Sequence, residues 1–435
     1  MSAQAAPPRV YLDHAATSPL RPEVLDALLP VLRAVGNPSS PHGSGRARRA
    51  LLETARESVA AALDADPVEV VLTSGATEAD DLAVAGIALA RRAADPRRTV
   101  VVCSAVEHPA VLGVADALAA TGRFTVVRLG VDGTGRVDVE ELTRLLDRDA
   151  GSVAVVSVMA ANNEVGTVQP VAEVVAACVP YEIPVHSDAA QATGALPLSF
   201  ARSGLAALSL TGHKVGGPVG TGALLLRRDV AVVARTAGGG QERGLRSGTL
   251  DAAGATGLAA AVLAAVSERA VAGPRVAGLR DALVRGVTDR VDGVALVGAA
   301  PGPQRLPGNA YLSFAGADVD ALLFALDRHG IDASAGSACH AGVTRSSHVL
   351  AALRSATART VARRTVGAGP LASGPGAGTG DGTGAGGVGD SGATGPVDGV
   401  RFSLGHSSTA ADVEALLDVI AESVALARSV AAVAA

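Results

Sequence analysis

The sequence predicts an α/β protein, with a large domain built on a mostly parallel sheet and a smaller α+β C-terminal domain. Between Val70 and Leu226, short β-branched runs alternate with stretches of helical periodicity, which is typical of βαβ units. After Gly248 the chain changes to an Ala-rich helical region, Leu250–Ala272, and then to a mixed stretch with few strand signals. With 435 residues, the chain is long enough to form two domains.

Short apolar runs are expected to form a seven-stranded sheet in the large domain. These runs are Val70–Thr73, Val100–Ser104, Thr125–Leu129, Val153–Met159, Val185–Asp188, Ala207–Leu210 and Gly222–Leu226. Helices are expected between them at Glu78–Ala90, Ala110–Ala120, Val139–Leu146 and Val171–Cys178. The second domain has strand candidates at Ala310–Phe314 and Arg401–Leu404. In sheets of this kind, ligands bind outside the carboxyl ends of the strands.

The domain organisation follows from these patterns. We expect residues 1–20 to join the small domain, 21–260 to form the large domain and 261–435 to form the small one. The stretch Gly367–Gly395 is almost wholly Gly, Ala, Ser, Thr, Pro and Asp. Such a stretch cannot bury enough apolar surface to offset its ordering entropy, so residues 356–396 are predicted to form a disordered insertion.

Charge and cysteine usage exclude several classes of function. A net charge of −5 argues against nucleic acid or a membrane surface as a direct partner. The N-terminus lacks a charged region followed by an apolar run, so no secretory signal is visible and a cytoplasmic protein is expected. The three cysteines, Cys103, Cys178 and Cys339, have no C-x-x-C spacing, so neither a disulfide framework nor a metal site is expected.

Lys214 is the only lysine among 37 Lys and Arg residues. Arg stays protonated in proteins, whereas a buried Lys can lose its proton and attack a carbonyl carbon. One lysine could also survive on the surface by chance, but the residues around Lys214 are not typical of a surface segment. Lys214 is therefore the candidate anchor for a cofactor that carries an aldehyde.

Two segments at predicted strand ends supply groups that such a cofactor needs. The segment Thr73–Glu78, which contains Ala76 and Thr77, is a strand followed by a Gly turn and a helix start. Its free backbone amides and the Thr77 hydroxyl form a phosphate cradle, although ordinary helix capping is the alternative. Asp188 ends another strand, where its carboxylate can keep a pyridine nitrogen protonated; a helix N-cap is again the alternative.

Two further segments complete the pattern. In Thr211–Lys214, the Thr211 hydroxyl and the His213 imidazole can grip phosphate next to the Lys214 amine. In Ala335–His340, a loop of small residues carries the Cys339 thiol, which lacks the apolar neighbours of a structural cysteine. Cys103 and Cys178 fit the default of a buried structural thiol. Together the segments suit pyridoxal 5′-phosphate held by Lys214.

The sequence resembles the cysteine desulfurases, which are pyridoxal-phosphate enzymes of the aspartate-aminotransferase-like fold (fold type I, class V). The likeness covers nearly the whole chain except the Gly-rich insertion. The matching stretches are Tyr11–Thr17, Gly36–Ser40, Thr73–Glu78, Asn162–Gly166, Asp188–Gln191, Gly212–Lys214, Gly238–Gly244, Arg246–Thr249, Gly336–Cys339 and Arg401–Gly405. Each is weak alone, but their shared order is specific.

The resemblance implies roles for further residues. It implies that His108 stacks on the pyridine ring and moves protons, and that Asn163 and Gln191 contact the ring's phenolic oxygen and edge. Arg401 and Asn37 are implied to bind substrate, with Arg401 holding its carboxylate, although in this Arg-rich chain Arg401 can also be a strand-end residue that binds nothing. Thr249 matches a phosphate ligand from the neighbouring subunit, so a homodimer is expected.

The resemblance also implies the reaction. Lys214 and His108 move protons while the Cys339 thiolate takes sulfur from L-cysteine, which leaves L-alanine and a persulfide. The sulfur then passes to an acceptor protein, either an iron–sulfur scaffold or a tRNA-thiolating enzyme. A selenocysteine lyase, a class V aminotransferase and a non-catalytic scaffold are the alternatives. Asp81 replaces the usual Asn of the family, which adds charge near the cofactor phosphate and can loosen it.

Overall fold

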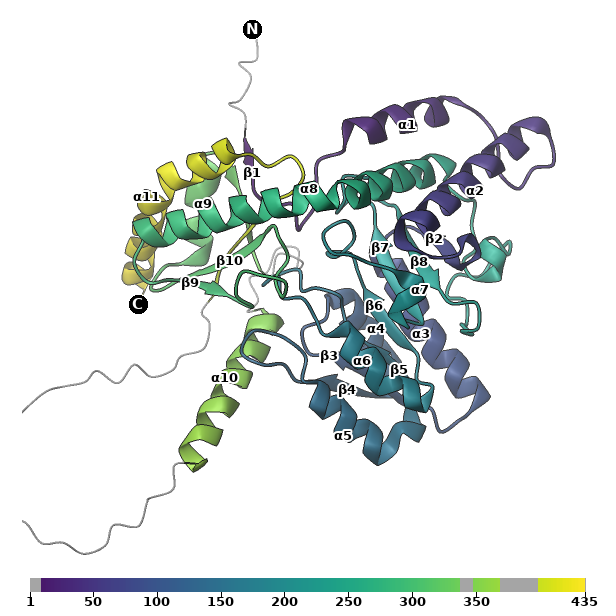
Figure 1. The fold of residues 1–435 in the computed structure, drawn as a ribbon, viewed down its shortest axis with the longest axis horizontal. Coiled ribbons are helices and arrows are strands. Elements are labelled where there is room, and N and C mark those ends of the chain that lie inside the picture. Colours follow the sequence, from purple (N-terminus) through teal and green to yellow (C-terminus); the bar gives the residue numbers. More distant parts are fainter. Residues whose placement is uncertain (1–8, 337–346, 368–397, 435) are drawn as a thin grey trace, which may run out of the picture.

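The computed structural model describes residues 9–336, 347–367 and 398–434, and the large domain within it contains a seven-stranded sheet (Figure 1). Its strands lie in the order β2-β8-β7-β6-β5-β3-β4. Their bounds are β2 Val70–Thr73, β3 Val100–Ser104, β4 Thr125–Leu129, β5 Val153–Ser157, β6 Val185–Asp188, β7 Ala207–Thr211 and β8 Gly222–Leu226. Only β8 is antiparallel to its neighbours in this sheet, so the predicted mostly parallel sheet is confirmed.

Helices and short 3-10 turns connect these strands and cover the sheet. The helices are α1 Pro22–Arg33, α2 Gly43–Leu63, α3 Ala76–Ala94, α4 Pro109–Ala120, α5 Val139–Asp149, α6 Val171–Cys178 and α7 Phe200–Ser203. The 3-10 turns are η1 Pro67–Glu69, η2 Ala150–Ser152, η3 Val179–Tyr181 and η4 Glu242–Gly244. Local signals set the helix starts: Pro22 and Pro109 open α1 and α4, and Asp138 caps α5 by accepting from the amide of Glu141.

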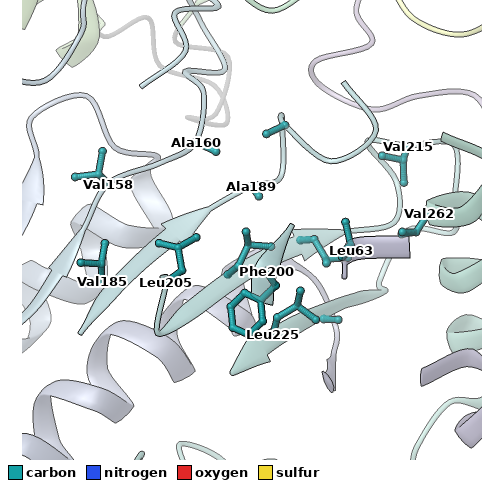
Figure 2. Packing of buried hydrophobic residues seen from close by; sticks show 14 of the residues in the cluster. Leu63, Val158, Ala160, Val185, Ala189, Phe200, Leu205, Val215, Leu225 and Val262 are labelled. Carbon is teal, nitrogen blue, oxygen red and sulfur yellow. The ribbon is translucent and has the colours of Figure 1, made fainter. Parts of the chain in front are cut away.

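The main hydrophobic core ties the sheet to helices from distant parts of the chain. Figure 2 shows Val185 of β6 and Leu225 of β8 in the same cluster as Phe200 of α7. Leu63 of α2 and Val262 of the long helix α8 belong to it as well. β-branched and Leu residues buried on both faces of a parallel sheet explain why the strands read as continuous apolar runs.

The small domain is built on a four-stranded antiparallel sheet with the order β12-β13-β10-β9. A separate two-stranded parallel sheet pairs β1 with β11, so the N-terminal segment lies in this domain and buries Leu12 in its core. The elements are β1 Val10–Tyr11, β9 Val294–Val297, β10 Asn309–Phe314, β11 Ile331–Asp332, β12 Ser334–Ala335, β13 Gly399–Ser403, α9 Val319–Arg328 and α11 Ala410–Ala434.

The 39-residue helix α8, Ala252–Arg290, runs across both domains (Figure 1). Its first half contributes Val262 to the main core and its second half contributes Leu283 to the small-domain core. The proposed boundary between residues 260 and 261 therefore falls inside a helix. By length and composition alone, α8 is the one helix in the described ranges that can cross a bilayer, a test that the core helix of a globular protein also passes.

Helix α10, His348–Gly367, overlaps the start of the disordered insertion predicted at residues 356–396 and corrects that prediction. The first part of that segment, up to Gly367, continues the helix instead of being disordered. The reason is compositional, because this part contains several Ala and Arg residues, which favour helix, and no Pro, whereas the Gly-rich stretch begins only afterwards. Residues 368–396 lie outside the described residues, so their disorder stays a prediction.

Candidate active site

The predicted site residues gather at one edge of the large sheet. Strands β2, β6 and β7 run in the same direction, and their last residues are Thr73, Asp188 and Thr211. His108 comes shortly after β3, which is parallel to β5 and through it to β6. The carboxyl ends of the strands therefore converge where ligands of such sheets bind.

The turn between β2 and α3 has the form of a phosphate cradle. Gly75 precedes the 19-residue helix α3 with a φ of 155°, a conformation that residues with a side chain rarely adopt. The first amides of α3, those of Ala76 and Thr77, stand at a helix N-terminus, where the helix dipole favours an anion. The Thr211 hydroxyl oxygen lies 3.7 Å from the place where a Cβ on Gly75 would stand, so the two predicted phosphate segments meet.

The end of β7 and the residues just after it carry the next two predicted phosphate ligands. Thr211 is buried, and its hydroxyl donates to the carbonyl of Thr221 at 3.1 Å. The hydroxyl oxygen can still accept a hydrogen bond from another donor. The Nδ1 atom of His213 lies 3.3 Å from the Thr17 hydroxyl. Burial, and to a smaller extent the charge of Lys214, lower the pKa of His213 to about 4. His213 is therefore a neutral hydrogen-bonding group at neutral pH.

Asp188 is buried at the end of β6, with an exposed fraction of 6%. Its Oδ1 accepts from the backbone amide of Ala190 at 2.8 Å. Burial raises its pKa to about 6, and the nearby charge of Asp80 raises it too, whereas His108 and the Ala190 bond lower it. A cation placed against the carboxylate removes this penalty, so the position favours a protonated partner.

His108 caps helix α4 and holds a defined tautomer. Its Nδ1 accepts from the amide of Ala110 at 3.1 Å, so a neutral ring carries its proton on Nε2. Burial lowers the pKa of His108; Asp188 opposes that shift and Lys214 adds to it. These causes require the three side chains to lie within electrostatic range of one another.

Lys214 contacts the N-terminal segment of the chain. Its Nζ donates to the carbonyl oxygen of Ala15 and, at 2.7 Å, to that of Ala16. The amide nitrogen of Gln191 donates to the same Ala15 carbonyl at 2.9 Å. Lys214 and Gln191 are therefore neighbours, and both line the same pocket together with Ala15.

Arg401 lies on β13 and is almost fully buried, with an exposed fraction of 3%. Its Nη1 donates to the carbonyl of Asn163 at 3.1 Å, which brings these two predicted residues together. Its Nη2 pairs with Asp13 Oδ1 at 2.7 Å. Within the described part of the chain, Nε has no hydrogen-bond partner. A buried, doubly held guanidinium is not the solvated strand-end Arg that the alternative interpretation requires.

Three predicted site residues are not joined to this group. Asn37 is exposed between α1 and α2, where its side chain accepts from the amide of Ser39 at 2.9 Å. Thr249 is also exposed, and it lines a pocket with Ser74 of the same chain. Cys339 lies outside the described residues. The roles of these three residues stay predictions.

The other two cysteines are structural, as predicted. Cys103 on β3 and Cys178 at the end of α6 are both fully buried. Burial raises the pKa of each thiol to about 12. Neither can supply a thiolate at neutral pH.

A buried polar layer behind Asp188 was not foreseen from the sequence. Asp80 and His186 are both fully buried, with 3.5 Å between Asp80 Oδ1 and His186 Nε2. His186 Nε2 also lies 2.9 Å from the Ser209 hydroxyl, and Nδ1 lies 2.9 Å from the Ser157 hydroxyl. Burial raises the pKa of Asp80 to about 7 and lowers that of His186 to about 4. The signal was the placement of His186 two residues before Asp188 on the same face of β6.

Glu164 is a second buried acid that sequence reasoning left without a role. It is 4% exposed, and its Oε2 accepts from the Ser347 hydroxyl at 2.5 Å. Burial raises its pKa to about 7, against the effects of Ser347 and Arg401, which lower it. Its position next to Asn163 in the Asn162–Gly166 stretch was the available signal.

The charge of Asp81, expected to loosen the cofactor phosphate, is compensated. Its Oδ2 lies 3.0 Å from Nε of Arg235, and both side chains are partly exposed. The added negative charge therefore has a cation beside it. Because this cation offsets the charge of Asp81, the electrostatic reason to expect weaker phosphate binding is reduced.

The residues at the strand ends fit pyridoxal phosphate. The group needs an amine, a carboxylate for its ring nitrogen and an anion cradle, and Lys214, Asp188 and the start of α3 supply them at one edge. The buried Asp188 in particular has a raised pKa that a cationic ring nitrogen would relieve.

Comparisons with known proteins agree with this arrangement. Residues 10–416 match the family model described as Aminotransferase class-V. The IscS-like cysteine desulfurase of Mycobacterium tuberculosis (strain H37Rv) is 46% identical over 98% of both chains. A solved NifS-like protein is 32% identical with a TM-score of 0.79, covering 95% of this chain and 98% of its own. A structure of SspA in complex with cysteine is 29% identical with a TM-score of 0.68, covering 79% and 94%. The chain belongs to the class-V aminotransferase family, a family of pyridoxal-phosphate enzymes with fold type I, and within it to the cysteine desulfurases.

Proposed function

We propose that this chain holds pyridoxal phosphate on Lys214 and uses it to desulfurate L-cysteine, leaving L-alanine. The observation that carries the proposal is the position of Asp188 at the end of β6 and of Lys214 shortly after β7, at the same edge of the sheet as the cradle at the start of α3. When bound, the cofactor supplies an electron sink for the amino acid's α-carbon. The start of α3, Thr211 and His213 would hold the phosphate, and Asn163 and Gln191 would hold the ring.

The chain's own groups then hold and move protons. Asp188 would keep the ring nitrogen of the bound cofactor protonated, because a buried carboxylate gains most from a cationic partner. The Lys214 amine moves the proton of the substrate α-carbon. His108 presents an Nε2–H and is kept neutral by burial, which suits a group that gives and receives protons.

Cys339 is proposed to receive the sulfur. Its thiolate attacks the substrate sulfur, the carbon–sulfur bond breaks with its electron pair left on the substrate carbon, and that carbon takes a proton to become the methyl group of alanine. Cys339 then carries a persulfide. The buried positions of Cys103 and Cys178 support Cys339 as the acceptor thiol, because neither of the other two can reach substrate.

A homodimer is proposed to complete the site. Helix α1 exposes Leu25, Leu29 and Leu32 along one stretch, and Val35 follows it with an exposed fraction of 85%. An apolar row of this kind favours burial against another surface. Thr249, exposed in the single chain, is proposed to reach the neighbouring subunit's phosphate, and Asn37 to bind substrate.

The persulfide is proposed to pass its sulfur to an acceptor protein in the cytoplasm, an iron–sulfur scaffold or a tRNA-thiolating enzyme. The net charge of −5 supports a protein acceptor in place of direct contact with nucleic acid or a membrane. Co-purification of the acceptor with a persulfide-loaded enzyme would identify the destination.

The visible spectrum of the purified protein tests the proposal. A yellow band near about 400 nm is expected, and it should be lost in Lys214→Ala. Borohydride reduction followed by peptide mass spectrometry should place the cofactor on Lys214, because no other lysine exists. A colourless protein that cannot be reconstituted with the cofactor would refute the proposal.

Cys339→Ser separates desulfuration from the alternatives. The variant should keep the yellow band but stop releasing sulfide from L-cysteine under reducing conditions. Cys178→Ser is the matched control and should keep both the band and the activity. Sulfide release by Cys339→Ser at the rate of the parent enzyme would exclude Cys339 as the sulfur acceptor.

A further inference from the structure

Asp13 forms a buried ion pair with Arg401, which the local sequence around either residue does not predict. Asp13 Oδ1 lies 2.7 Å from Arg401 Nη2, and the side chains are 16% and 3% exposed. The other carboxylate oxygen of Asp13 accepts from the Ser334 hydroxyl at 2.7 Å. Ser334 is the cross-strand partner of Arg401 between β12 and β13. Asp13 is therefore held by both strands of the pair that carries Arg401.

The backbone around Asp13 is fixed as well. Asp13 forms a parallel bridge with Ser403 of β13, whose amide donates to Leu12 at 2.7 Å and whose carbonyl accepts from His14 at 3.1 Å. The Ser403 hydroxyl accepts from the amide of Ala15 at 2.9 Å. The same segment therefore reaches from Arg401 to the carbonyls that hold Lys214.

We propose that Asp13 is a positioning residue that orients the Arg401 guanidinium toward the α-carboxylate of the substrate amino acid. This inference rests on the proposed role of Arg401 in the function above. A guanidinium is planar, so fixing Nη2 by Asp13 and Nη1 by the Asn163 carbonyl also fixes the direction of Nε. Nε is enclosed and has no hydrogen-bond partner in the described residues, so its N–H is a donor that the free chain leaves unsatisfied.

The pair also sets the charge that the substrate meets. A buried guanidinium without a counter-charge is costly, and Asp13 removes that cost in the free enzyme. Because Asp13 and Arg401 together are neutral, the substrate carboxylate is recognised mainly through the direction of the remaining N–H groups. This favours a planar carboxylate, which accepts two parallel hydrogen bonds, over a neutral amide.

Ligand binding to the cofactor-loaded enzyme tests the proposal. L-alanine, which carries the carboxylate, and L-alaninamide, which does not, are titrated while the visible absorbance of the cofactor is followed. Asp13→Asn should weaken L-alanine by about 10- to 100-fold, the loss that a misplaced binding group produces. It should leave L-alaninamide unchanged. Asp332→Asn is the matched control, because Asp332 lies on the neighbouring strand β11 and pairs with Arg9 instead of Arg401.

Further variants distinguish a failure of the proposed role of Arg401 from a failure of the proposed role of Asp13. Arg401→Gln should also weaken L-alanine selectively; if it does not, the proposed role of Arg401 fails. If Arg401→Gln weakens L-alanine and Asp13→Asn does not, or if Asp13→Asn weakens both ligands alike, the positioning role of Asp13 is refuted. Ser334→Ala keeps the ion pair and removes one anchor of Asp13, so it gives the same test with a smaller selective loss if Asp13→Asn does not fold.

Discussion

Glu242 forms a buried ion pair with Arg56, and we expect this one carboxylate to contribute strongly to the free energy of unfolding of the large domain. Glu242 has a fully buried side chain, and its two oxygens accept from Arg56 Nη2 at 2.7 Å and Nη1 at 2.9 Å. One of them also accepts from the amide of Leu72 at 2.8 Å. Glu242→Gln replaces one of these acceptors by an NH2 group, which then faces a donor and leaves the Arg56 charge with only the largely exposed Glu53, 3.2 Å from its Nε, as counter-charge.

The expected loss follows from that geometry. Breaking a buried ion pair by removing one partner costs about 3–5 kcal/mol. In a domain of roughly this size, 1 kcal/mol lowers the melting temperature by about 2–4 °C, so Glu242→Gln should melt about 6–20 °C lower. Glu242 begins η4 and fixes the start of the segment that leads to Thr249, a predicted phosphate ligand. The variant should therefore also bind the cofactor more weakly.

Thermal unfolding of the cofactor-free protein by circular dichroism measures the effect. Asp95→Asn is the control, because the Asp95–Arg97 pair is exposed and ion pairs in water contribute little to stability. Arg56→Met should be destabilised like Glu242→Gln, and the double variant should lose less than the sum of the two. A shift for Glu242→Gln no larger than that of Asp95→Asn, or strict additivity in the double variant, would refute the reasoning.

Three smaller perturbations test the buried charges and thiols near the site. The pKa of Glu164 is about 7 in the folded protein against 4.5 in the unfolded chain, so its stabilisation is present below pH 4.5 and is lost as pH rises through 7. Denaturant unfolding should therefore show Glu164→Gln gaining about 3 kcal/mol relative to the parent between these pH values, and a pH-independent difference would contradict the assignment. Asp81→Asn should change stability and cofactor binding by less than about 1 kcal/mol in unfolding and cofactor-titration assays, because its pair with Arg235 is partly exposed; a larger change in cofactor affinity would restore a phosphate-site role. Cys103 and Cys178 should resist iodoacetamide at pH 8 until the protein is unfolded, as read by mass spectrometry, and rapid labelling of the native protein would contradict their burial.

Most strands of the large sheet were predictable because they are short apolar runs buried on both faces, whereas the edge strand β4 is partly exposed. Their bounds differ from the prediction mainly where a side chain replaces a strand partner. Strand β5 ends at Ser157 instead of Met159, because the amide of Met159 donates to the buried carboxylate of Glu107. Helix α8 continues past Pro274, where the sequence predicts an end. Packing of its two halves in two different cores outweighs the local break.

Local sequence motifs predicted the functional side chains at strand ends, but they did not predict the buried side chains that interact with them. Lys214, Asp188 and Thr211 each follow a recognisable strand, so the topology alone brings them together. The pair of Asp13 and Arg401 spans 388 residues, and no periodicity or spacing connects the two. Asp80 was equally hidden, because its burial depends on how α3 packs on the sheet.

The contacts of Lys214 link the cofactor site to the substrate site. In the cofactor-free chain its Nζ donates to the carbonyls of both Ala15 and Ala16. Covalent attachment to an aldehyde leaves this nitrogen with at most one hydrogen, so at least one carbonyl must lose its donor. That change falls two to three residues from Asp13, in a segment whose backbone is bonded to β13. We therefore expect the loading of Lys214 and the orientation of Arg401 to be coupled through residues 13–16, so that a variant that loosens this segment disturbs both.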